Sequence, residues 1–550
     1  MKTCYLDIET DLAHQQIWCA VTKVEGQDAV LHTSSATLPS PTEYVYVAHY
    51  GMGFDFPMLS KVWNWHVPVT HQEDTILLSK LWDTNIKGGA SLRAWGERLK
   101  LDDGKIDFDK ELFDWGYTEE MGAYCVRDVE VLEKVHKYLT ARVGTWTDAI
   151  SLEHKVRDIT NWQQECGFKM DVSRVTEMWT ELVGKRASIE QQLHEVFPPI
   201  VTKRISEKTG KRLKDDVEVF NIGSRQQIAR RLESLGAKFT ERTEPTENGG
   251  GGNIKVDEST LKPLATKYPE AQLCLDYLTL GKREGMLNGW LKNVNDDGRM
   301  YGSVDTLGAI TGRMTHQRPN MAQVEKGEAM RGCWIVDEGN RLVGVDASGL
   351  ELRMLAHYMQ DPDYTHQVSS GDVHTVNQLA AGLETRDEAK TFIYAFLYGA
   401  GDEKIGSIIG KGASAGKAMK ARFLKNTPAL KDLREKISRI AEQGSIPALD
   451  GRRLRVRHKH AALNTLLQGA GAIVMKRGLV VAHGSLAKAD VPWRLVAQVH
   501  DEIQAETWSK DAHVVGQHLV HGIVEAGRYY NMRCPLAAEA KIGNSWAETH

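Results

Sequence analysis

The segment RLVGVDASGLELR, residues Arg341–Arg353, decides how the C-terminal half of this chain is expected to fold. Its first part is an apolar run typical of a buried strand, and this strand delivers Asp346 at its end. A helix is predicted to begin just beyond it. A carboxylate at a strand end, beside backbone carbonyls, is a good ligand for a hard cation. Strand-end aspartates are also common as caps, so this segment alone leaves both interpretations open.

A second informative segment is RDEAKTFIYAFLYG, which begins at Arg386. Arg386, Lys390, Tyr394 and Tyr398 recur at a spacing of four and therefore line one face of a predicted helix. Two cations followed by two aromatic rings suit a nucleoside triphosphate, with charge for the phosphates and rings for the sugar and base. An ordinary amphipathic helix with a buried aromatic half has the same pattern.

The third segment, RLVAQVHDEIQAE, predicts a strand, a turn and a second strand, with His500, Asp501 and Glu502 at the turn. Adjacent carboxylates repel each other unless a cation or solvent relieves the repulsion. The segment is therefore either a second cation ligand or an exposed acidic turn.

The N-terminal region contains a separate group of acids. Asp7 and Glu9 in YLDIET alternate along a predicted strand, so both carboxylates face the same side. Asp55 follows in AHYGMGFDFPML, and Tyr124 and Asp128 in YCVRD lie four residues apart on one helix face. Any one of these acids would be an ordinary surface charge.

Composition and charge limit the class of protein. The chain has 550 residues, 41% hydrophobic and 26% charged, as expected for a globular protein of several domains. Its net charge of −4 divides into −9 for residues 1–148 and +5 for the remainder, which suits a metal-binding module joined to a polyanion-binding one. The seven scattered cysteines form no CxxC pair, so neither a zinc site nor a disulfide framework is expected.

Targeting signals are also not expected. No stretch approaches the roughly 18 uninterrupted apolar residues of a membrane span, and the start MKTCYLDIET has carboxylates where a signal peptide would be apolar. A reducing cytoplasm fits best.

The three C-terminal segments, taken in order, resemble the sequence motifs of family A DNA polymerases. DASGLELR, RDEAKTFIYAFLYGAGDEKIG, HAALNTLLQ, VHDEIQ and the terminal KIGNSWAETH are most similar to the T-seven-type phage replicative branch. The resemblance implies an α/β and α+β multidomain fold, with a ribonuclease H-like 3′→5′ exonuclease domain followed by a right-hand polymerase. Its expected parts are the exonuclease (1–148), thumb (149–300), first palm segment (301–370), fingers (371–443) and second palm segment (444–550).

The resemblance further implies two-metal phosphoryl transfer. Asp346, the backbone carbonyl of Ala347 and Asp501 would hold two Mg²⁺ ions, with Mn²⁺ as a substitute, about 3.5–4 Å apart. Glu502 would assist electrostatically. His374, Arg386 and Lys390 would contact the incoming phosphates, and Lys390 would also protonate the departing pyrophosphate.

Several other positions acquire roles only through this resemblance. Glu351 would exclude a 2′-hydroxyl, Tyr394 would tolerate a missing 3′-hydroxyl, and Tyr398 with Gly399 would lie beside the nascent base pair. Donors in the minor groove can check base-pair geometry without reading sequence, because the acceptors there are alike for every correct pair. The residues implied for this task are Arg313, Asn464, Gln468, Gln498 and His500.

The N-terminal acids resemble the DEDDy 3′→5′ exonucleases. Asp7, Glu9, Asp55 and Asp128 would bind two further metal ions, and Tyr124 would orient the attacking water. This chain departs from the pattern at Tyr50, where many relatives have asparagine, so the placement of the single strand is expected to differ. Asp74 is assigned a structural role.

A thumb feature of this branch is shortened here. Its best-known member has a long thumb insertion that captures host thioredoxin, but only about twenty residues separate Phe197 from Phe220 in this chain. Thioredoxin capture is therefore not expected. The basic stretch between Thr202 and Val217 is expected either to contact duplex phosphates or to be a solvated hairpin, and Glu244–Asn253, with four consecutive glycines, is expected to be a surface loop.

The leading hypothesis is a replicative phage DNA polymerase with proofreading, acting on primer-template DNA and dNTPs in the cytoplasm of the bacterial host. A helicase-primase and a single-strand binding protein are the expected partners, and no membrane is involved. The alternatives are a repair or gap-filling polymerase of the same family, or a non-catalytic DNA-binding protein that has kept the fold. An RNA polymerase is disfavoured by Glu351.

Overall fold

The computed structural model describes residues 1–101, 116–205, 208–244 and 252–550. The chain forms two compact units, one comprising Met1–Lys169 with Tyr301–His550 and the other Met170–Met300. Helix α5 (Thr147–Cys166) belongs to the first unit, because Leu152 and Val156 pack against Ile473. The second compact unit begins at Met170, whereas the thumb is expected from residue 149, and the expected domain bounds stay predictions. Short strands β6 (Phe168–Met170) and β9 (Arg299–Met300) fall where the chain passes between the units.

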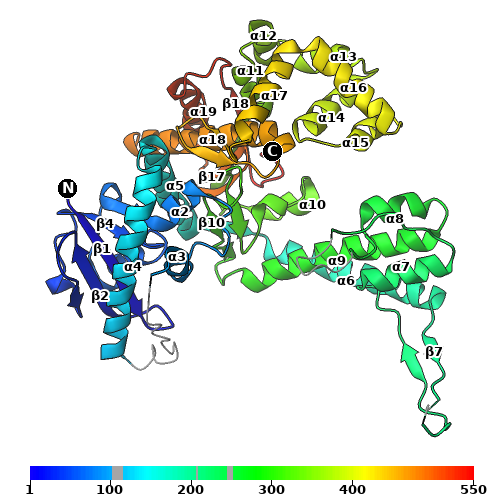
Figure 1. Ribbon diagram of the computed structural model, residues 1–550, viewed down its shortest axis with the longest axis horizontal. Helices are drawn as coiled ribbons and strands as arrows, with labels where there is room; N and C mark the ends of the chain where they lie inside the picture. The colour runs from blue at the N-terminus through cyan, green and yellow to red at the C-terminus, as the bar shows by residue number, and fades with distance from the viewer. Residues whose placement is uncertain (102–115, 206–207, 245–251) are drawn as a thin grey trace. The chain divides into compact units, whose positions relative to one another are not determined.

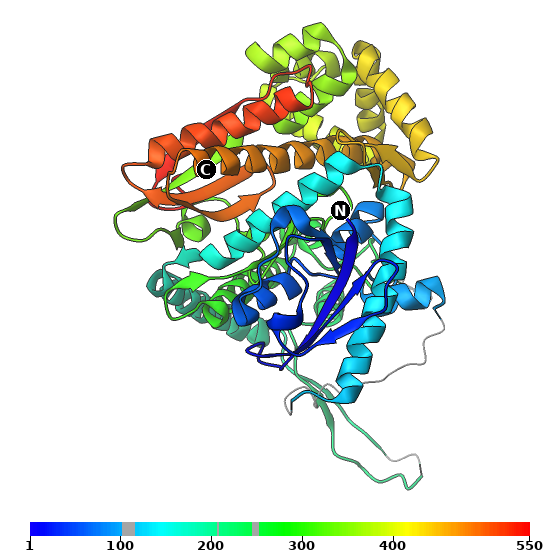
Figure 2. The same cartoon turned by 90° about the vertical axis from the view of Figure 1, so that its left-hand side faces the viewer.

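A mixed five-stranded sheet forms the N-terminal part of the first unit (Figure 2). Its central strand β1 pairs antiparallel with β2 and parallel with β4, and α4 packs against β1 and β2. This sheet is consistent with the ribonuclease H-like domain that the sequence predicts, although that assignment stays a prediction. In sheet order the strands are β3 (Val30–His32), β2 (Ile17–Val24), β1 (Thr3–Thr10), β4 (Val45–Ala48) and β5 (Gln72–Asp74), and the helices are α1 (Asp55–Trp63), α2 (Thr75–Trp82), α3 (Leu92–Leu99) and α4 (Glu119–Val143).

A four-stranded antiparallel sheet forms the centre of the C-terminal part (Figure 1). The strand–turn–helix predicted around Asp346 and the hairpin predicted around Asp501 are both confirmed. Helices α18 (Ala462–Lys488) and α19 (Ala512–Tyr529) pack against each other, and α19 also packs on the sheet. In sheet order the strands are β16 (Trp493–Val499), β17 (Glu502–Trp508), β13 (Asn340–Ala347) and β18 (Ala538–Gly543).

Helix α18 is long and apolar enough to cross a membrane by length and composition alone. However, 83% of its most apolar 18-residue window is buried inside the protein. Its apolar side chains therefore belong to the core, where Leu466, Ala470 and Leu479 contribute to the largest hydrophobic cluster.

A helical segment is inserted between β13 and the second half of this sheet. Within it, α14 (Arg386–Leu397) is the helix predicted from the fourfold spacing, and it begins with a capping box formed by Thr385 and Glu388. Phe392 and Phe396 of α14 pack against Phe423, which fixes the helix by its apolar face. The segment contains α11 (Leu350–Met359), α12 (Pro362–Ser370), α13 (Val373–Ala381), α14, α15 (Asp402–Ser407), α16 (Ala413–Asn426), α17 (Pro428–Ala441) and the hairpin β14 (Ser445–Pro447)–β15 (Arg453–Arg455).

Four further short elements precede β13. Strand β10 (Ser303–Asp305) pairs with β11 (Thr315–Gln317), and α10 (Glu328–Arg331) and β12 (Trp334–Ile335) follow them.

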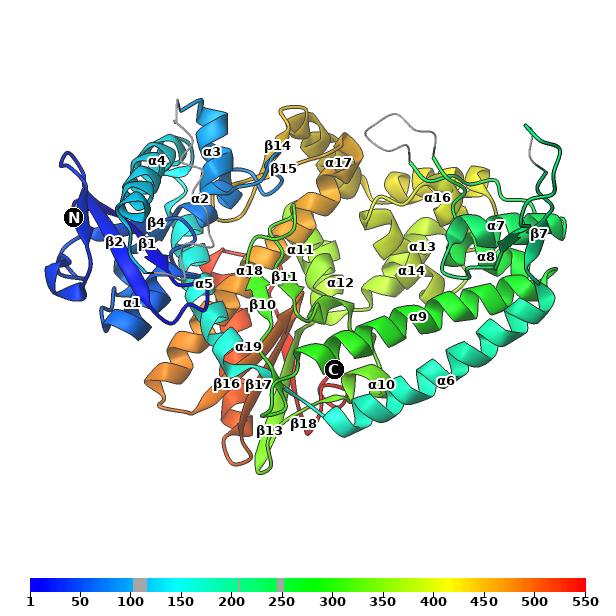
Figure 3. The same ribbon diagram turned by 90° about the horizontal axis from the view of Figure 1, so that it is seen from below.

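The second unit is built on two long helices, α6 (Val172–Val196) and α9 (Pro269–Asn293), which lie side by side in Figure 3. Helices α7 (Arg225–Ser234) and α8 (Glu258–Ala265) complete its small core. The basic stretch forms a hairpin of β7 (Ile200–Thr202) and β8 (Asp216–Glu218), which extends away from α7 and α8 (Figure 1). The glycine-rich loop lies mostly outside the described residues, although Arg242 and Ile254 pair at its base.

Candidate active sites

The structure brings together Asp346 and Asp501, which are far apart in the sequence. Asp346 lies opposite Glu502 in the β13–β17 ladder, and the Ala347 backbone N–H donates to the Asp501 backbone oxygen at 2.9 Å. The antiparallel register therefore places the β16–β17 turn beside the end of β13. Two carboxylates and the Ala347 backbone meet where β13 ends and β17 begins, at one end of the two central strands.

The electrostatics of this pair suit a divalent cation. Burial, followed by the charges of Asp501 and Glu502, raises the pKa of Asp346 to about 7. Burial also raises the pKa of Asp501. Carboxylates whose pKa values are raised by burial and by neighbouring negative charge are relieved by a bound cation, and carboxylate and carbonyl oxygens are the ligands that Mg²⁺ prefers.

Glu502 is a different kind of residue from the two aspartates. It is 3% exposed and forms an ion pair with Arg331 at 3.1 Å. It also accepts hydrogen bonds from Gln504 Nε2 at 2.6 Å and from the indole nitrogen of Trp546. Its charge is therefore already balanced inside the protein, which agrees with the expected electrostatic rather than ligand role.

His550 is a site residue that sequence reasoning missed. Its Nδ1 lies 3.0 Å from Glu502 Oε2 and 3.9 Å from Asp346 Oδ2. Asp346, Glu502 and His550 together form a group that could hold a metal ion. Arg331 stands in a segment with no recognisable pattern, and the resemblance of the terminal KIGNSWAETH gave His550 no role, so only the folded chain reveals their contacts with Glu502.

The expected triphosphate contacts gather around the start of α14. Burial, followed by the charges of the nearby Arg386 and Lys390, lowers the pKa of His374. Arg386 donates from Nε to Asp372 at 2.9 Å, and Lys390 is exposed. The tyrosine rings follow along the same helix, with 6.4 Å between the Tyr394 and Tyr398 centroids. Gly399, just beyond them, has a φ of +76°.

Glu351 is held between two side chains at the start of α11. Tyr398 donates its hydroxyl to Glu351 Oε1 at 2.9 Å, and Arg313 donates to the same oxygen at 3.1 Å. Glu351, which is expected to exclude a 2′-hydroxyl, is thus hydrogen-bonded to Tyr398, which is expected to lie beside the nascent base pair. Arg313 is engaged in this ion pair, so its minor-groove role stays a prediction.

The remaining four groove residues lie on α18, on β16 and in the turn that follows β16. Asn464 and Gln468 are half-buried at the start of α18, four residues apart. Gln498 is buried on β16, and its Oε1 has no hydrogen-bond partner among the described residues. His500 lies in the turn with a φ of +58°, and burial followed by the Arg313 charge lowers its pKa. Their roles at the duplex stay predictions.

The second carboxylate cluster lies at the N-terminal sheet. Burial raises the pKa of Asp7, and the charges of Asp55, Asp128 and Glu9 raise it further, which shows that all four acids are close together. Burial raises the pKa of Asp55 to about 7 and that of Asp128 to about 6. Tyr124 is hydrogen-bonded to Asp128. Strand β1 and helices α1 and α4 thus assemble the five residues that the sequence predicted.

Two neighbours of this cluster add detail. The Cys125 thiol lies 3.5 Å from Asp7 Oδ2, a contact that no sequence pattern indicated. Asp74 accepts hydrogen bonds from the backbone N–H groups of Tyr50, Met52 and Ile76 at 2.9–3.1 Å. Asp74 caps the N-terminus of α2, and its hydrogen bonds to Tyr50 and Met52 hold the loop before α1 in place. These contacts are structural.

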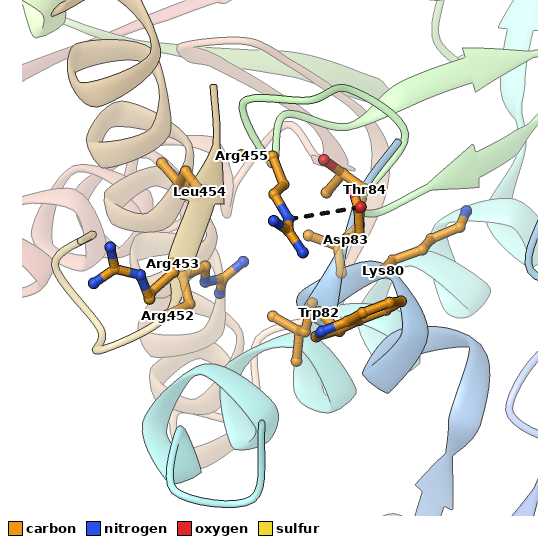
Figure 4. Close-up of a pocket in the computed structure, with 11 residues that line it drawn as sticks. Lys80, Trp82, Asp83, Thr84, Arg452, Arg453, Leu454 and Arg455 are labelled. Atoms are coloured by element: carbon orange, nitrogen blue, oxygen red, sulfur yellow. Dashed lines mark ion pairs between the residues drawn. The ribbon is translucent and has the colours of Figure 1, made fainter. Parts of the chain in front are cut away.

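The cavity in Figure 4 lies where α2 meets strand β15. Arg455 forms an ion pair with Asp83 at 3.6 Å, drawn as a dashed line, and its guanidinium carbon lies 5.8 Å from the Trp82 ring centroid. This cavity contains none of the candidate catalytic residues. It lies at the contact between the N-terminal part and the C-terminal part of the first unit.

Comparisons with known proteins agree with this geometry. Residues 198–548 match DNA polymerase family A. The chain is 32% identical over 657 aligned positions to the DNA-directed DNA polymerase of Escherichia phage T7, with 92% of each chain covered. It is 32% identical to the corresponding enzyme of Enterobacteria phage T3, again with 92% of each covered, and 27% identical to DNA polymerase I of Aquifex aeolicus, with 76% of this chain and 71% of the relative covered.

A solved structure has the same fold. The POL domain of Pol1 from M. smegmatis, in complex with DNA primer-template and dNTP, superimposes with a TM-score of 0.80 at 18% identity, covering 99% of this chain and 95% of that one. The fold is that of a family A polymerase, and the family match defines a nucleotidyltransferase. This chain belongs to DNA polymerase family A and is a DNA-directed DNA polymerase homologous to the phage T7 and T3 enzymes.

Proposed function

We propose that this protein replicates phage DNA in the cytoplasm of the bacterial host by template-directed addition of deoxynucleotides to a primer 3′ end, and that it proofreads with a 3′→5′ exonuclease. The observation that carries the polymerase assignment is the meeting of Asp346 and Asp501 where β13 ends beside the β16–β17 turn. The observation that supports proofreading is the gathering of four acids and Tyr124 at β1.

At the polymerase site, Asp346, the Ala347 carbonyl and Asp501 are the residues that would hold Mg²⁺. Bound metal would lower the pKa of the primer 3′-hydroxyl and would stabilise the negative charge of the leaving pyrophosphate. His374, Arg386 and Lys390 bind the triphosphate, and Lys390 donates a proton to the pyrophosphate oxygen. Tyr394 and Tyr398 contact the nucleotide through their rings, and Glu351 lies where a 2′-hydroxyl would point. Tyr398 and Arg313 hold that carboxylate in place.

At the nuclease site, Asp7, Glu9, Asp55 and Asp128 are the residues that would hold the metal ions. Tyr124, which is hydrogen-bonded to Asp128, orients the water that attacks the terminal phosphodiester. The raised pKa values of these carboxylates support a bound cation at this site as well.

Primer extension on a long primed template tests the proposal. The isolated protein should extend the primer with Mg²⁺ and dNTPs, and an Asp501→Asn variant should not. Strand-displacement and processivity assays, alone and with a cognate helicase, distinguish a replicative enzyme from a repair or gap-filling one. Failure of the wild-type protein to extend any primer would reject the polymerase assignment.

The same assay addresses partners. Alignments with the phage T7 and T3 relatives extend over 657 and 660 positions, whereas this chain has 550 residues, so both relatives contain segments that are absent here. The short β7–β8 hairpin supports the view that thioredoxin is not a partner, and added thioredoxin should leave product length unchanged. A helicase-primase and a single-strand binding protein are the proposed partners.

Substrate choice gives a further check. Tyr394 predicts efficient use of dideoxynucleotides, and Tyr394→Phe is the matched variant that removes only the hydroxyl. We expect the variant to discriminate against the dideoxy form at least about tenfold more than the wild type, or about 1.4 kcal/mol. Strong discrimination by the wild-type enzyme would refute this role for Tyr394.

A further inference from the structure

Asp372 connects the two helices that carry the expected triphosphate contacts. It is the N-cap of α13, and its carboxylate accepts hydrogen bonds from the backbone N–H groups of His374 at 3.2 Å and Thr375 at 3.4 Å. The Thr375 hydroxyl donates to it at 2.8 Å. Arg386, the first residue of α14, donates from Nε to Oδ2 at 2.9 Å and to Oδ1 at 3.2 Å of the same carboxylate. One side chain therefore links the first turn of α13 to the first turn of α14.

The segment between these helices is also held in place. Gln378 Nε2 donates to the Glu384 carbonyl at 2.8 Å. The Glu388 carboxylate accepts from the backbone N–H groups of Glu384 at 3.1 Å and Thr385 at 2.9 Å. Asp372 is therefore an anchor of defined position for Arg386, whose long side chain has many rotamers when nothing holds it.

The geometry of this ion pair leaves Arg386 able to bind a phosphate. Both hydrogen bonds to Asp372 use Nε–H, so neither uses the two terminal nitrogens. Those nitrogens present the paired N–H groups that match a phosphate. Because the guanidinium is planar and rigid, a carboxylate fixed at Nε also sets the direction of the terminal N–H groups.

Folding stability does not explain this contact. The Arg386 and Asp372 side chains are 54% and 45% exposed, and ion pairs with such exposure contribute little to stability. The hydrogen bond from Arg386, followed by that from Thr375, lowers the pKa of Asp372, so the carboxylate is ionised at neutral pH. Its negative charge also offsets the repulsion between Arg386 and Lys390 before a nucleotide binds.

We propose that Asp372 is a positioning residue for nucleotide binding, which holds the Arg386 guanidinium so that its terminal N–H groups face the triphosphate. The proposal rests on the proposed triphosphate role of Arg386. A side chain that is already held in its binding geometry loses less conformational entropy when the ligand arrives, so preorganisation increases affinity. Asp372 acts through Arg386 and does not touch the nucleotide, because a carboxylate repels phosphate.

Nucleotide affinity provides the primary test. The full-length protein with Mg²⁺ and a fluorescently labelled, dideoxy-terminated primer-template is titrated with dNTP, so that binding is measured without reaction. Asp372→Asn keeps the cap, because asparagine caps helices as well as aspartate, and removes only the charge that holds Arg386. The variant should raise the Kd for dNTP about three- to tenfold.

Kinetics separate positioning from a general loss of structure. In single-turnover extension of a reactive primer, Asp372→Asn should leave the rate at saturating dNTP within about twofold of the wild type, because only binding is weakened. The KM for pyrophosphate in the reverse reaction should rise by a similar factor to the Kd for dNTP, because pyrophosphate has neither base nor sugar. The preference between dideoxy and deoxy substrates should not change, because Tyr394 is untouched. A merely structural role would instead lower the saturated rate.

Two control variants isolate the contact. Asp387→Asn removes a neighbouring carboxylate charge in the first turn of α14 and should leave the Kd for dNTP within about twofold of the wild type. Asp361→Ala removes the cap of α12, where Asp361 accepts from the Tyr364 N–H at 3.0 Å. Asp361→Ala and Asp372→Ala should both lower the melting temperature, because each loses a cap. Only Asp372→Ala should also weaken dNTP binding, by about tenfold or more.

A double-mutant cycle shows whether Asp372 acts through Arg386. Arg386→Gln should weaken dNTP binding more than Asp372→Asn does, and adding Asp372→Asn to Arg386→Gln should change the Kd by less than about twofold. Equal effects of Asp372→Asn in both backgrounds would overturn the proposal, as would unchanged or tighter binding by the single variant.

The outcomes distinguish this role from the proposed function. Wild-type affinity in Arg386→Gln would reject the triphosphate role of Arg386 and the positioning role with it. A protein that binds dNTP in the way described but never extends a primer would reject the proposed synthesis and leave the positioning role standing.

Discussion

The two carboxylate clusters differ in how their negative charge is balanced. Around the polymerase pair, Lys326 and Lys541 offset the charge of Asp346, and Glu502 is paired with Arg331 and His550. In the nuclease cluster, Asp7, Asp55 and Asp128 are more deeply buried, and Arg127 is the cation that acts on Asp128. The polymerase site is therefore partly compensated by protein charges, whereas the nuclease site depends more on protons or bound cations.

This comparison teaches that similar residue types can be prepared for metal in two ways. A compensated site keeps its aspartates closer to the ionised state before metal arrives, because nearby cations favour the charged form. An uncompensated site holds protons until metal displaces them, so its metal affinity depends more strongly on pH.

The largest expected effect separates the two sites. Asp346→Ala or Asp501→Ala should lower the rate of nucleotide addition at least about a thousandfold, or about 4 kcal/mol, and leave nuclease activity within about twofold. Asp7→Ala combined with Glu9→Ala should do the reverse. Single-turnover rates of both reactions on one preparation provide the measurement. Loss of both activities from one substitution would show that the clusters are not independent.

Removing the compensating charge should destabilise the polymerase site. Arg331→Ala leaves Glu502 buried without its counterion, which costs about 3–5 kcal/mol. The urea midpoint should fall accordingly, and Arg331→Met with Glu502→Gln should recover much of the loss because the charge is removed along with its partner. Arg93→Ala, which breaks an exposed pair with Glu97, is the control and should leave the midpoint unchanged. An unaffected Arg331→Ala protein would refute the compensation.

The pH dependence of the metal-free protein should expose the difference directly. The pKa of Asp55 is raised from 3.8 to about 7, so the folded protein keeps a proton that the unfolded chain releases. The resulting stabilisation is fully present below pH 3.8 and is lost as the pH rises through about 7.

In chelator, Asp55→Asn should therefore melt a few degrees higher than the wild type at pH 8, corresponding to about 1–2 kcal/mol, and the gap should shrink at pH 5. Mg²⁺ should close the gap at pH 8 by stabilising the wild type. Asp346→Asn should give a smaller shift, because that side chain is 43% exposed and lies near cations. Equal melting of Asp55→Asn and wild type at pH 8 would contradict the burial argument.

The smallest effect concerns DNA affinity rather than either chemical site. If cations of the β7–β8 hairpin bind duplex phosphates, neutralising each such cation should lower the salt slope of duplex binding by about 0.9 and shorten the products. Single-nucleotide addition at saturating DNA should not change. The variant neutralises the six hairpin cations, Lys203, Arg204, Lys208, Lys211, Arg212 and Lys214. Unchanged processivity would favour the solvated hairpin instead.

Much of the polymerase site could be predicted from local pattern. The apolar run before Asp346 predicted one strand, and RLVAQVHDEIQAE predicted two strands around a turn. The structure forms all three, as β13, β16 and β17. The fourfold spacing of Arg386, Lys390, Tyr394 and Tyr398 likewise indicated α14, whose period is set by helix geometry.

Other features could not be predicted because they depend on distant partners. Helix α5 has the amphipathic pattern of its helical neighbours, yet Glu153 is fully buried with Arg452 and Lys476 in the first unit. That ionic interaction joins residues about 300 positions apart, so the domain boundary at Met170 is established only once the chain has folded.

The sequence alone predicted which residues carry the chemistry, because strand and helix periods set the faces on which acids, cations and rings stand and the family resemblance implied their roles. Only the tertiary structure decided how their charges are balanced. Arg331 and His550 reach Glu502, and Arg157 reaches Tyr50, through packing between segments remote in the chain. The physical reason is that side-chain period is a local property of the backbone, whereas burial and Coulomb interactions depend on distances that folding creates.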